Sequence, residues 1–436
     1  MDSDRRQSLL ARSTQHKNWV PHVRGPHGRV FVRGVEVPRF WVRGIARTQK
    51  ISAPFALTLS AVFVLALLIT ACRPHDFPQY PPNYREYVYV TNGGSDTVTV
   101  LDVVNVRLDR ELAVGRNPVA VAASPTRNEI YVVNAGAEGA NGSVSVIDAE
   151  HNAVVATIPV HRQPLSIDVD ADGARAYVAN SASNSISVID LKARREVAQF
   201  GAGVEPVAAR IAPDGKTLVV ANQKGNSVTV IDPASGQVRA VFADCPGAAD
   251  PVILPDSTKV FVACSAGHQV MVIALANAKT RPNQPDQLEA LMDVGRGPSD
   301  LALKPDGGEI FASNSLSDSV SEIYNTTDEV GDTYTIGADP VRGLVSPDNA
   351  LLYVANLRSQ EVTVYSIEDG KRVGALHVGN GPAAMAFSAA GHLLFVVDSG
   401  SGDVAVARTA SQSLFTMLPA GRNPNAIVDK AFKVGQ

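Results

Sequence analysis

The sequence predicts an all-β fold, an eight-bladed β-propeller of four-stranded antiparallel blades, on three observations. A phrase of the form Tyr-Val-x-Asn returns along most of the chain with a basal period of 42 residues. Each repeat alternates Val and Ile with other residues, and Gly, Asn, Asp and Pro separate its apolar runs. Periods of this length are typical of repeat arrays and propellers. The two-residue alternation favours strands and excludes helical repeats.

Eight repeats align on the residue that ends this phrase. The end residues are 42 apart except for one insertion of four residues and one of eight, and they are Asn92, Asn134, Asn180, Asn222, Cys264, Asn314, Asn356 and Asp398. Each repeat has four apolar runs, which in the second repeat are residues 118–124, 129–134, 143–148 and 153–160. We expect each repeat to form a blade, with the terminal Asn satisfying the backbone of a turn.

The two ends of the repeat region predict how the ring closes. The region opens with a run of the second type, at residues 87–92, and ends with a run of the first type, at residues 423–429. Pairing of this last strand with the first N-terminal sheet completes the eighth blade and leaves no terminal blade open. We therefore expect a closed, monomeric propeller over residues 87–434.

These phrases resemble the YVTN family of β-propeller repeat proteins. The matching stretches are YVTN, YVVN, YVAN and VVAN on the second strand, VTVLD, VSVID, ISVID and VTVID on the third, and VGRNP before the first. The turns APDGK and KPDGG match as well, and the resemblance covers about residues 87–430. It implies a radial ring of four-stranded sheets. The family often builds seven blades, whereas eight are legible in this sequence.

The N-terminal region predicts export. Residues 55–72 form an uncharged apolar run after a basic stretch, as in a signal peptide. Its end, ITAC at residues 69–72, resembles the lipobox of bacterial lipoproteins, which implies lipidation of Cys72. An uncleaved anchor helix is the alternative. We expect a signal region at 1–71, then the lipidated Cys72 and a Pro-rich tether at 72–86, which hold the protein on the cell envelope, in the periplasm or at the cell surface.

The charge of the folded part argues against one class of partner. The chain has a formal net charge of −4, but residues 72–436 hold 28 Lys or Arg against 40 Asp or Glu. An acidic body is the opposite of a nucleic-acid-binding footprint, so we expect no nucleic-acid partner.

The loops between the outer strand of one blade and the inner strand of the next emerge on the same face of the ring as the turns between second and third strands. Function on a rigid scaffold is usually carried by such loops, so we expect it on this face. Two residues before the inner strand's Pro, four of these loops carry arginine: Arg116, Arg162, Arg296 and Arg422. Three of them precede successive inner strands of the closed ring, with His161 beside them. They predict an anion- or partner-binding arc, and the alternative is that Arg merely keeps a repeated loop soluble.

Two further sets of residues predict structural contacts. Cys245 lies in one such loop and Cys264 ends a neighbouring second strand, so an exported protein can join them in a disulfide. Asp168 and Arg210 occupy equal positions on consecutive inner strands. Asp300 and Arg342 do the same. We expect them to form ion pairs beside the central channel, with a channel ligand site as the alternative.

The sequence contains none of the enzyme motifs that we sought: no C-x-x-C-H, no H-E-x-x-H and no G-x-S-x-G. Both tryptophans precede Cys72, so the stacking residue of quinone-dependent propellers is missing. Haem d1 propellers also have eight blades and use an axial His, for which His161, His268 and His377 are candidates. Lactonase propellers are a further comparison, but the sequence offers no carboxylate cluster for their metal site.

We therefore expect a non-catalytic propeller without metal or cofactor that presents its loop face to a protein, a glycan or a small anionic ligand. The alternative is a periplasmic redox-associated enzyme or a propeller that binds a haem d1-like cofactor.

Overall fold

The structure, a computed structural model, describes residues 78–277 and 279–435. All described residues belong to one compact unit, residues 75–436. The predicted signal region and the lipidation site at Cys72 lie outside the described residues, as do the first residues of the tether, 72–77. Within the described ranges, no helix is both long enough and apolar enough to cross a membrane.

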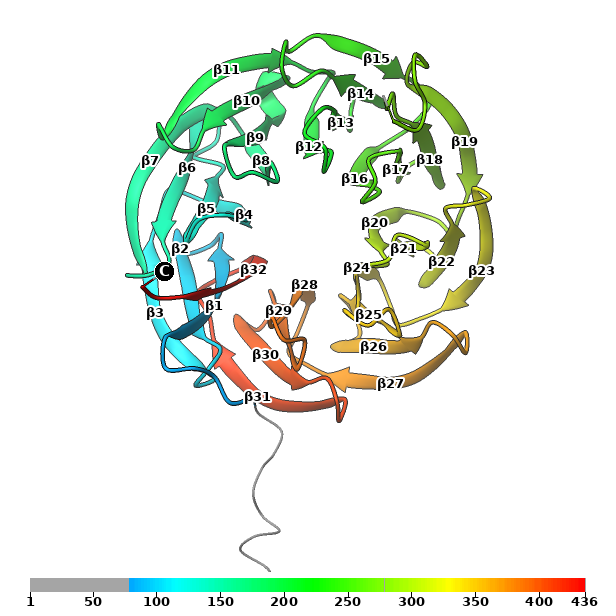
Figure 1. Ribbon diagram of the computed structural model, residues 1–436. Coiled ribbons are helices and arrows are strands. Elements are labelled where there is room, and N and C mark those ends of the chain that lie inside the picture. The colour runs from blue at the N-terminus through cyan, green and yellow to red at the C-terminus, as the bar shows by residue number, and fades with distance from the viewer. Residues whose placement is uncertain (1–77, 278, 436) are drawn as a thin grey trace, which may run out of the picture. The chain divides into compact units, whose positions relative to one another are not determined.

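The described part of the chain forms eight four-stranded antiparallel sheets arranged radially around a central channel (Figure 1). The eight predicted blades are therefore confirmed. The first four blades comprise β1 (Tyr84–Asn92), β2 (Thr97–Asp102), β3 (Arg107–Ala113) and β32 (Pro424–Lys433); β4 (Pro118–Ala123), β5 (Glu129–Asn134), β6 (Asn141–Asp148) and β7 (Ala153–Arg162); β8 (Pro164–Val169), β9 (Arg175–Asn180), β10 (Ser185–Asp190) and β11 (Arg195–Gly201); and β12 (Pro206–Ile211), β13 (Leu218–Asn222), β14 (Ser227–Ile231) and β15 (Val238–Phe242).

In the third blade a short 3-10 helix, η1 (Ser181–Ser183), lies between β9 and β10. Each of the other four blades runs from an inner strand beside the channel to an outer strand. The strands are β16 (Ala248–Ile253), β17 (Lys259–Cys264), β18 (Gln269–Ala274) and β19 (Gln287–Asp293); β20 (Pro298–Leu303), β21 (Glu309–Asn314), β22 (Ser319–Tyr324) and β23 (Glu329–Thr335); β24 (Pro340–Val345), β25 (Leu351–Asn356), β26 (Glu361–Ser366) and β27 (Lys371–His377); and β28 (Pro382–Phe387), β29 (Leu393–Asp398), β30 (Asp403–Arg408) and β31 (Ser413–Pro419).

The last strand closes the ring, as the sequence predicts. β32 supplies the inner strand of the first blade and pairs antiparallel with β1, from Tyr84 opposite Lys433 to Thr91 opposite Ala426. The first and last strands of the propeller thus lie side by side, blue against red, in Figure 1. Since the first blade combines both ends of the propeller, neither end forms a free blade.

The boundary of the predicted tether is wrong by three residues, because β1 begins at Tyr84 rather than after residue 86. The residues just before the strand are also held. Tyr80 stacks on Tyr84 with ring centroids 4.8 Å apart, and its hydroxyl hydrogen-bonds to His392 Nε2 at 3.1 Å. These aromatic contacts, which the Pro-rich composition does not indicate, fix the start of the propeller against its last blade.

The hydrophobic core lies between neighbouring blades rather than inside one. One cluster, for example, joins Tyr131 and Val133 of β5 to Val178 of β9 and Ile189 of β10. An aromatic residue stands three positions before the terminal Asn, Asp or Cys in seven of the eight blades. These residues, almost completely buried, are Tyr89, Tyr131, Tyr177, Phe261, Phe311, Tyr353 and Phe395. The recurring phrase therefore packs each blade onto the next.

The Asn that ends the phrase links strands rather than mainly capping a turn, which corrects the expectation from sequence. In six blades its Nδ2 donates to a Ser or Thr hydroxyl on the third strand at 2.8–3.0 Å, as from Asn222 to Thr229. The same side chain occupies the space that a Cβ atom would need on a glycine in the loop before the inner strand. A Cβ on Gly203 would lie 2.6 Å from Asn222, so that loop position excludes a side chain.

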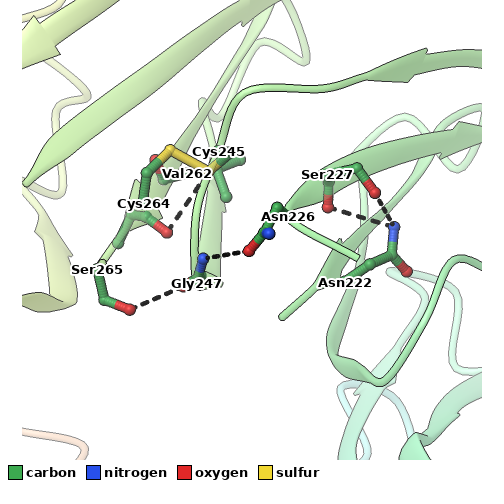
Figure 2. The surroundings of a disulfide bond; sticks show 9 residues. Asn222, Asn226, Ser227, Cys245, Gly247, Val262, Cys264 and Ser265 are labelled. Atoms are coloured by element: carbon green, nitrogen blue, oxygen red, sulfur yellow. Dashed lines mark hydrogen bonds between the residues drawn. A yellow bond between two sulfur atoms is a disulfide. The ribbon is translucent and has the colours of Figure 1, made fainter. Parts of the chain in front are cut away.

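In the fifth blade a disulfide replaces this contact. Cys245 stands where six of the other seven blades have the loop glycine, Cys264 stands where six of them have Asn, and the two sulfur atoms are bonded (Figure 2). The third strand changes too, because buried Met271 occupies the position of the hydroxyl. In this blade a covalent bond therefore joins the loop to the end of the second strand, whereas in other blades the Asn hydrogen-bonds to the third strand.

In the eighth blade a carboxyl group takes the place of the amide. Asp398 is fully buried, its Oδ2 accepts a hydrogen bond from Gly379 N at 2.9 Å, and its Oδ1 has no partner among the described residues. Burial, together with nearby Asp403, raises the pKa of Asp398 to about 7. The folded protein therefore binds a proton here at pH values where the unfolded chain has released it.

Asp398→Asn is accordingly expected to gain stability relative to the wild type as the pH rises to 8, although Ala405 stands where the blades with Asn offer the amide a hydroxyl. The raised pKa means that the wild type loses stability as the pH rises from about 4, where an exposed Asp ionises, to about 7. The variant avoids this loss, so its stability relative to the wild type should rise by about 1–3 kcal/mol over the same interval. Urea denaturation at pH 4, 6 and 8 measures it.

Asn356→Asp is the matched control, because it introduces the same carboxyl group five residues before Glu361, as Asp398 stands five before Asp403. It should destabilise the protein most at pH 8. Equal stability of wild type and Asp398→Asn at every pH would contradict this assignment.

Candidate functional site

The loop face consists of the loops that join outer to inner strands and the turns between second and third strands. Main-chain hydrogen bonds tie each loop to the turn of the following blade, for example from Ala135 N to Asn117 O and from Ser181 N to Gln163 O. The residue just before the inner strand has a positive φ in all eight loops, at 117, 163, 205, 247, 297, 339, 381 and 423. This left-handed residue sharply turns the chain, so the side chain before it, Arg in four loops, stands at the rim.

Two of the four predicted arginines hydrogen-bond to the backbone of a turn in the following blade. The Nη2 of Arg162 donates to Ala182 O and that of Arg296 to Leu316 O, both at 3.1 Å. Each carbonyl belongs to the turn that the loop already contacts. These guanidinium groups therefore help to hold the loop face together, although both side chains remain exposed.

The other two arginines flank a single turn, residues 93–96 between β1 and β2. On one side Arg422 O accepts from Gly94 N at 2.9 Å and Arg422 N donates to Ser95 Oγ at 3.1 Å. On the other side Asn117 N, next to Arg116, donates to Asp96 Oδ1 at 2.8 Å. Both arginines are exposed, and within residues 78–277 and 279–435 neither guanidinium group has a hydrogen-bonding or ionic partner.

A crevice of about 620 Å³ lies beside Arg422, between the loops of the eighth and first blades. Its lining is rich in hydroxyl groups and exposed backbone, with Ser95, Ser399, Ser401 and glycines 400, 402 and 421, and Glu111 at its edge. Most of these donors are already engaged, because Ser399 Oγ donates to Gly381 O and Ser401 Oγ donates to Asp403 Oδ1, and the N–H groups of the three glycines donate to neighbouring loops and strands. The guanidinium group of Arg422 therefore supplies both the charge and the open donors for an anion.

The histidines named from sequence lie apart from one another. His161 Nε2 contacts Glu196 Oε1 at 3.2 Å, and its backbone N donates to Asn180 Oδ1. His268 Nδ1 accepts from Gly297 N at 3.2 Å, and His377 is exposed on β27. In the described part of the chain, no three His, Cys, Asp or Glu side chains are grouped so that they could hold a metal ion.

The predicted channel pairs are only half right. Arg342 Nη1 contacts Asp300 Oδ1 at 2.5 Å. Arg210, however, forms no ion pair with Asp168, and its Nη2 lies 3.7 Å from Asp250 Oδ1. Asp250 was not predicted from the sequence, although it stands 14 residues before Cys264, as Asp300 stands 14 before Asn314. In the structure β16 is bulged between Ala249 and Val252, and Asp250 has a φ of 41°.

The channel carboxylates share another role that the sequence did not indicate. Each accepts a hydrogen bond from the inner strand of the next blade: Asp168 from Ile211 N, Asp250 from Leu301 N and Asp300 from Gly343 N, at 2.7–2.9 Å. Burial raises the pKa of Asp168, and it raises that of Asp300 to about 6 against the opposing charge of Arg342. At neutral pH Asp300 is thus still the anion that holds Arg342.

A closed ring of radial four-stranded sheets, with polar loops on one face, defines the chain as a β-propeller repeat protein. A sequence profile of the family described as "Lactonase, 7-bladed beta-propeller" matches residues 152–254 and 250–377, more than half of the chain. The chain belongs to this family, although its ring has eight blades rather than seven. Comparison with curated proteins gave no match.

Several solved structures are similar. Hydrazine synthase of Kuenenia stuttgartiensis is 25% identical, with a TM-score of 0.51 and coverage of 64% of this chain and 91% of that one. Dihydro-heme d1 dehydrogenase NirN in complex with DHE is 17% identical, with a TM-score of 0.65 and coverage of 83% and 77%. AztD from Citrobacter koseri is 14% identical, with a TM-score of 0.62 and coverage of 81% and 99%. The last two likenesses concern the fold alone.

Proposed function

We propose that this protein is a non-catalytic binding propeller, exported and lipid-anchored at Cys72, whose loop face receives a small anion or an acidic group of a partner protein or glycan. One observation carries the proposal: Arg116 and Arg422 flank the same turn, their guanidinium groups lack partners in the described ranges, and a hydroxyl-rich crevice adjoins Arg422. On an acidic body, two such cations form a local site for a carboxylate or phosphate.

Inorganic phosphate and citrate are suitable probes, with binding to the purified protein measured by isothermal titration calorimetry at low salt. Replacing Arg116 and Arg422 together by Gln is expected to weaken binding at least about tenfold, because each charge-assisted hydrogen bond contributes about 1.5–3 kcal/mol. The effect should shrink at high salt, as expected for an exposed site.

Arg162→Gln together with Arg296→Gln is the matched control, since it removes the same charge from the same loop position of two other blades. Its guanidinium groups already donate to turn carbonyls, so binding should change less than about threefold. Equal losses in the two double variants would reject a localised site in favour of a general charge effect. A visible absorption band in the purified protein would favour the cofactor-binding alternative instead.

A further inference from the structure

A chamber of about 830 Å³ occupies the central channel, and it is lined by the inner strands of all eight blades. This volume lies within the range of small-molecule sites in proteins. The loop-face arginines do not line it, so it is separate from the anion site proposed above.

The two halves of the chamber differ in chemistry. Four consecutive inner strands, β12, β16, β20 and β24, each present one charged residue: Arg210, Asp250, Asp300 and Arg342. The four inner strands opposite, β28, β32, β4 and β8, contribute no charged lining residue. Their lining is mainly aliphatic, including Val119, Val121, Leu165, Ile167, Met385 and Ile427.

On the charged side, all four residues line the chamber, but the arginines are more exposed than the carboxylates. The side chain of Asp300 is only 4% exposed, and its two oxygens accept from Arg342 and from Gly343 N. Arg342 itself remains 46% exposed, although it lies within the channel. Asp300 therefore acts as a positioning residue that orients a guanidinium group whose other N–H donors remain accessible.

Arg210 repeats this arrangement more loosely. Its side chain is 33% exposed and stands 3.7 Å from Asp250, whose own side chain is 18% exposed and accepts from Leu301 N. The accessible polar atoms of the charged half are thus mainly guanidinium N–H donors. Because two arginines and two aspartates balance, the lining has no net charge, so an anion is attracted by the exposed guanidinium groups and not by an excess of positive charge. The nearby carboxylates disfavour a dianion.

We propose that the chamber binds a small monocarboxylate with an apolar body. Arg342, held by Asp300, takes the carboxylate with support from Arg210, since a planar guanidinium group matches a carboxylate with two parallel hydrogen bonds. The apolar body lies against the aliphatic half, where its removal from water adds to the affinity. This site is independent of the loop-face function, and either can exist without the other.

Octanoate is the probe, with octanamide as its uncharged analogue and inorganic phosphate as an anion without an apolar body, each titrated into the purified protein by calorimetry. We expect octanoate to bind at least about tenfold more tightly than octanamide, and phosphate to leave octanoate binding unchanged. Equal affinities for octanoate and octanamide would overturn the proposal, as would no binding of octanoate to the folded protein.

The variant experiment replaces the pair together, Asp300→Asn with Arg342→Gln, so that no buried charge is left alone. Thermal melting verifies its folding. We expect octanoate affinity to fall at least about tenfold, and Arg210→Gln alone to give a smaller loss. The Arg116→Gln, Arg422→Gln variant should bind octanoate as the wild type does. Undiminished octanoate binding by the folded Asp300→Asn, Arg342→Gln variant would overturn the proposal.

Discussion

Deleting residues 424–436 is expected to abolish folding of the propeller. The deletion removes β32, the inner strand of the first blade, and leaves the whole length of β1 without its partner. Apolar residues of β32 also pack in the cores on both sides of that blade, Ile427 on one side and Val428 and Phe432 on the other. Each such side chain contributes about 1.5–3 kcal/mol when buried. Together with the lost ladder, this matches the typical stability of a whole domain, about 5–15 kcal/mol.

The measurement is far-UV circular dichroism with size-exclusion chromatography of the truncated protein. Exposed edges of β1 should make it aggregate, since an unpaired strand recruits other chains. Removal of only Gly435 and Gln436 is the control, and it should melt as the wild type does because β32 stays intact. A cooperative, native-like melting transition of the longer truncation would contradict this prediction.

The second large effect concerns the disulfide of the fifth blade. Replacing Cys264 by Ser is expected to lower the free energy of unfolding by about 2–4 kcal/mol, because the bond closes a loop between positions 19 residues apart. Denaturation in urea without reductant measures the loss. The wild type with added dithiothreitol should lose a similar amount, and dithiothreitol should not affect the variant.

The sequence of the other blades suggests a rescue, and the structure predicts that it is incomplete. Cys245→Gly with Cys264→Asn restores the usual loop glycine and strand Asn, but Met271 leaves the buried amide without its hydroxyl partner. An unsatisfied buried amide costs about 1–3 kcal/mol. The double variant should therefore be no more stable than Cys264→Ser.

Adding Met271→Thr tests the coupling of these three positions. In the wild type this substitution should cost about 2 kcal/mol or more, because it removes a buried apolar side chain. In the Cys245→Gly, Cys264→Asn background it should cost distinctly less, since the new hydroxyl accepts the Asn amide hydrogen. Identical costs in the two backgrounds would mean that the three positions act independently.

Much of the fold could be predicted because each repeat carries its own strand pattern and turn residues. Eight such patterns, with a second-type strand first and a first-type strand last, are enough to predict eight blades, and the family profile alone would have suggested seven. The disulfide could be anticipated because Cys245 and Cys264 replace residues at two aligned positions.

The site was harder to predict because it depends on where side chains point. Counting 42 residues placed Arg210 opposite Asp168, yet Arg210 lies nearer to Asp250 on β16, and Asp168 bonds to the backbone of the next blade. The four loop arginines look equivalent in sequence. Only the hydrogen bonds to Ala182 O and Leu316 O distinguish Arg162 and Arg296 from the other two arginines.

A single cross-linking experiment tests most directly the central claim, that β32 closes an eight-bladed ring on β1. Tyr84 and Lys433 are directly opposite across the two strands, so Tyr84→Cys with Lys433→Cys should form a disulfide on mild oxidation. Tyr84→Cys with Lys371→Cys, on β27 of the seventh blade, should not. Mass spectrometry of the digested protein is expected to find residues 84 and 433 in one linked peptide pair. Absence of that link in the oxidised, folded protein would contradict the account.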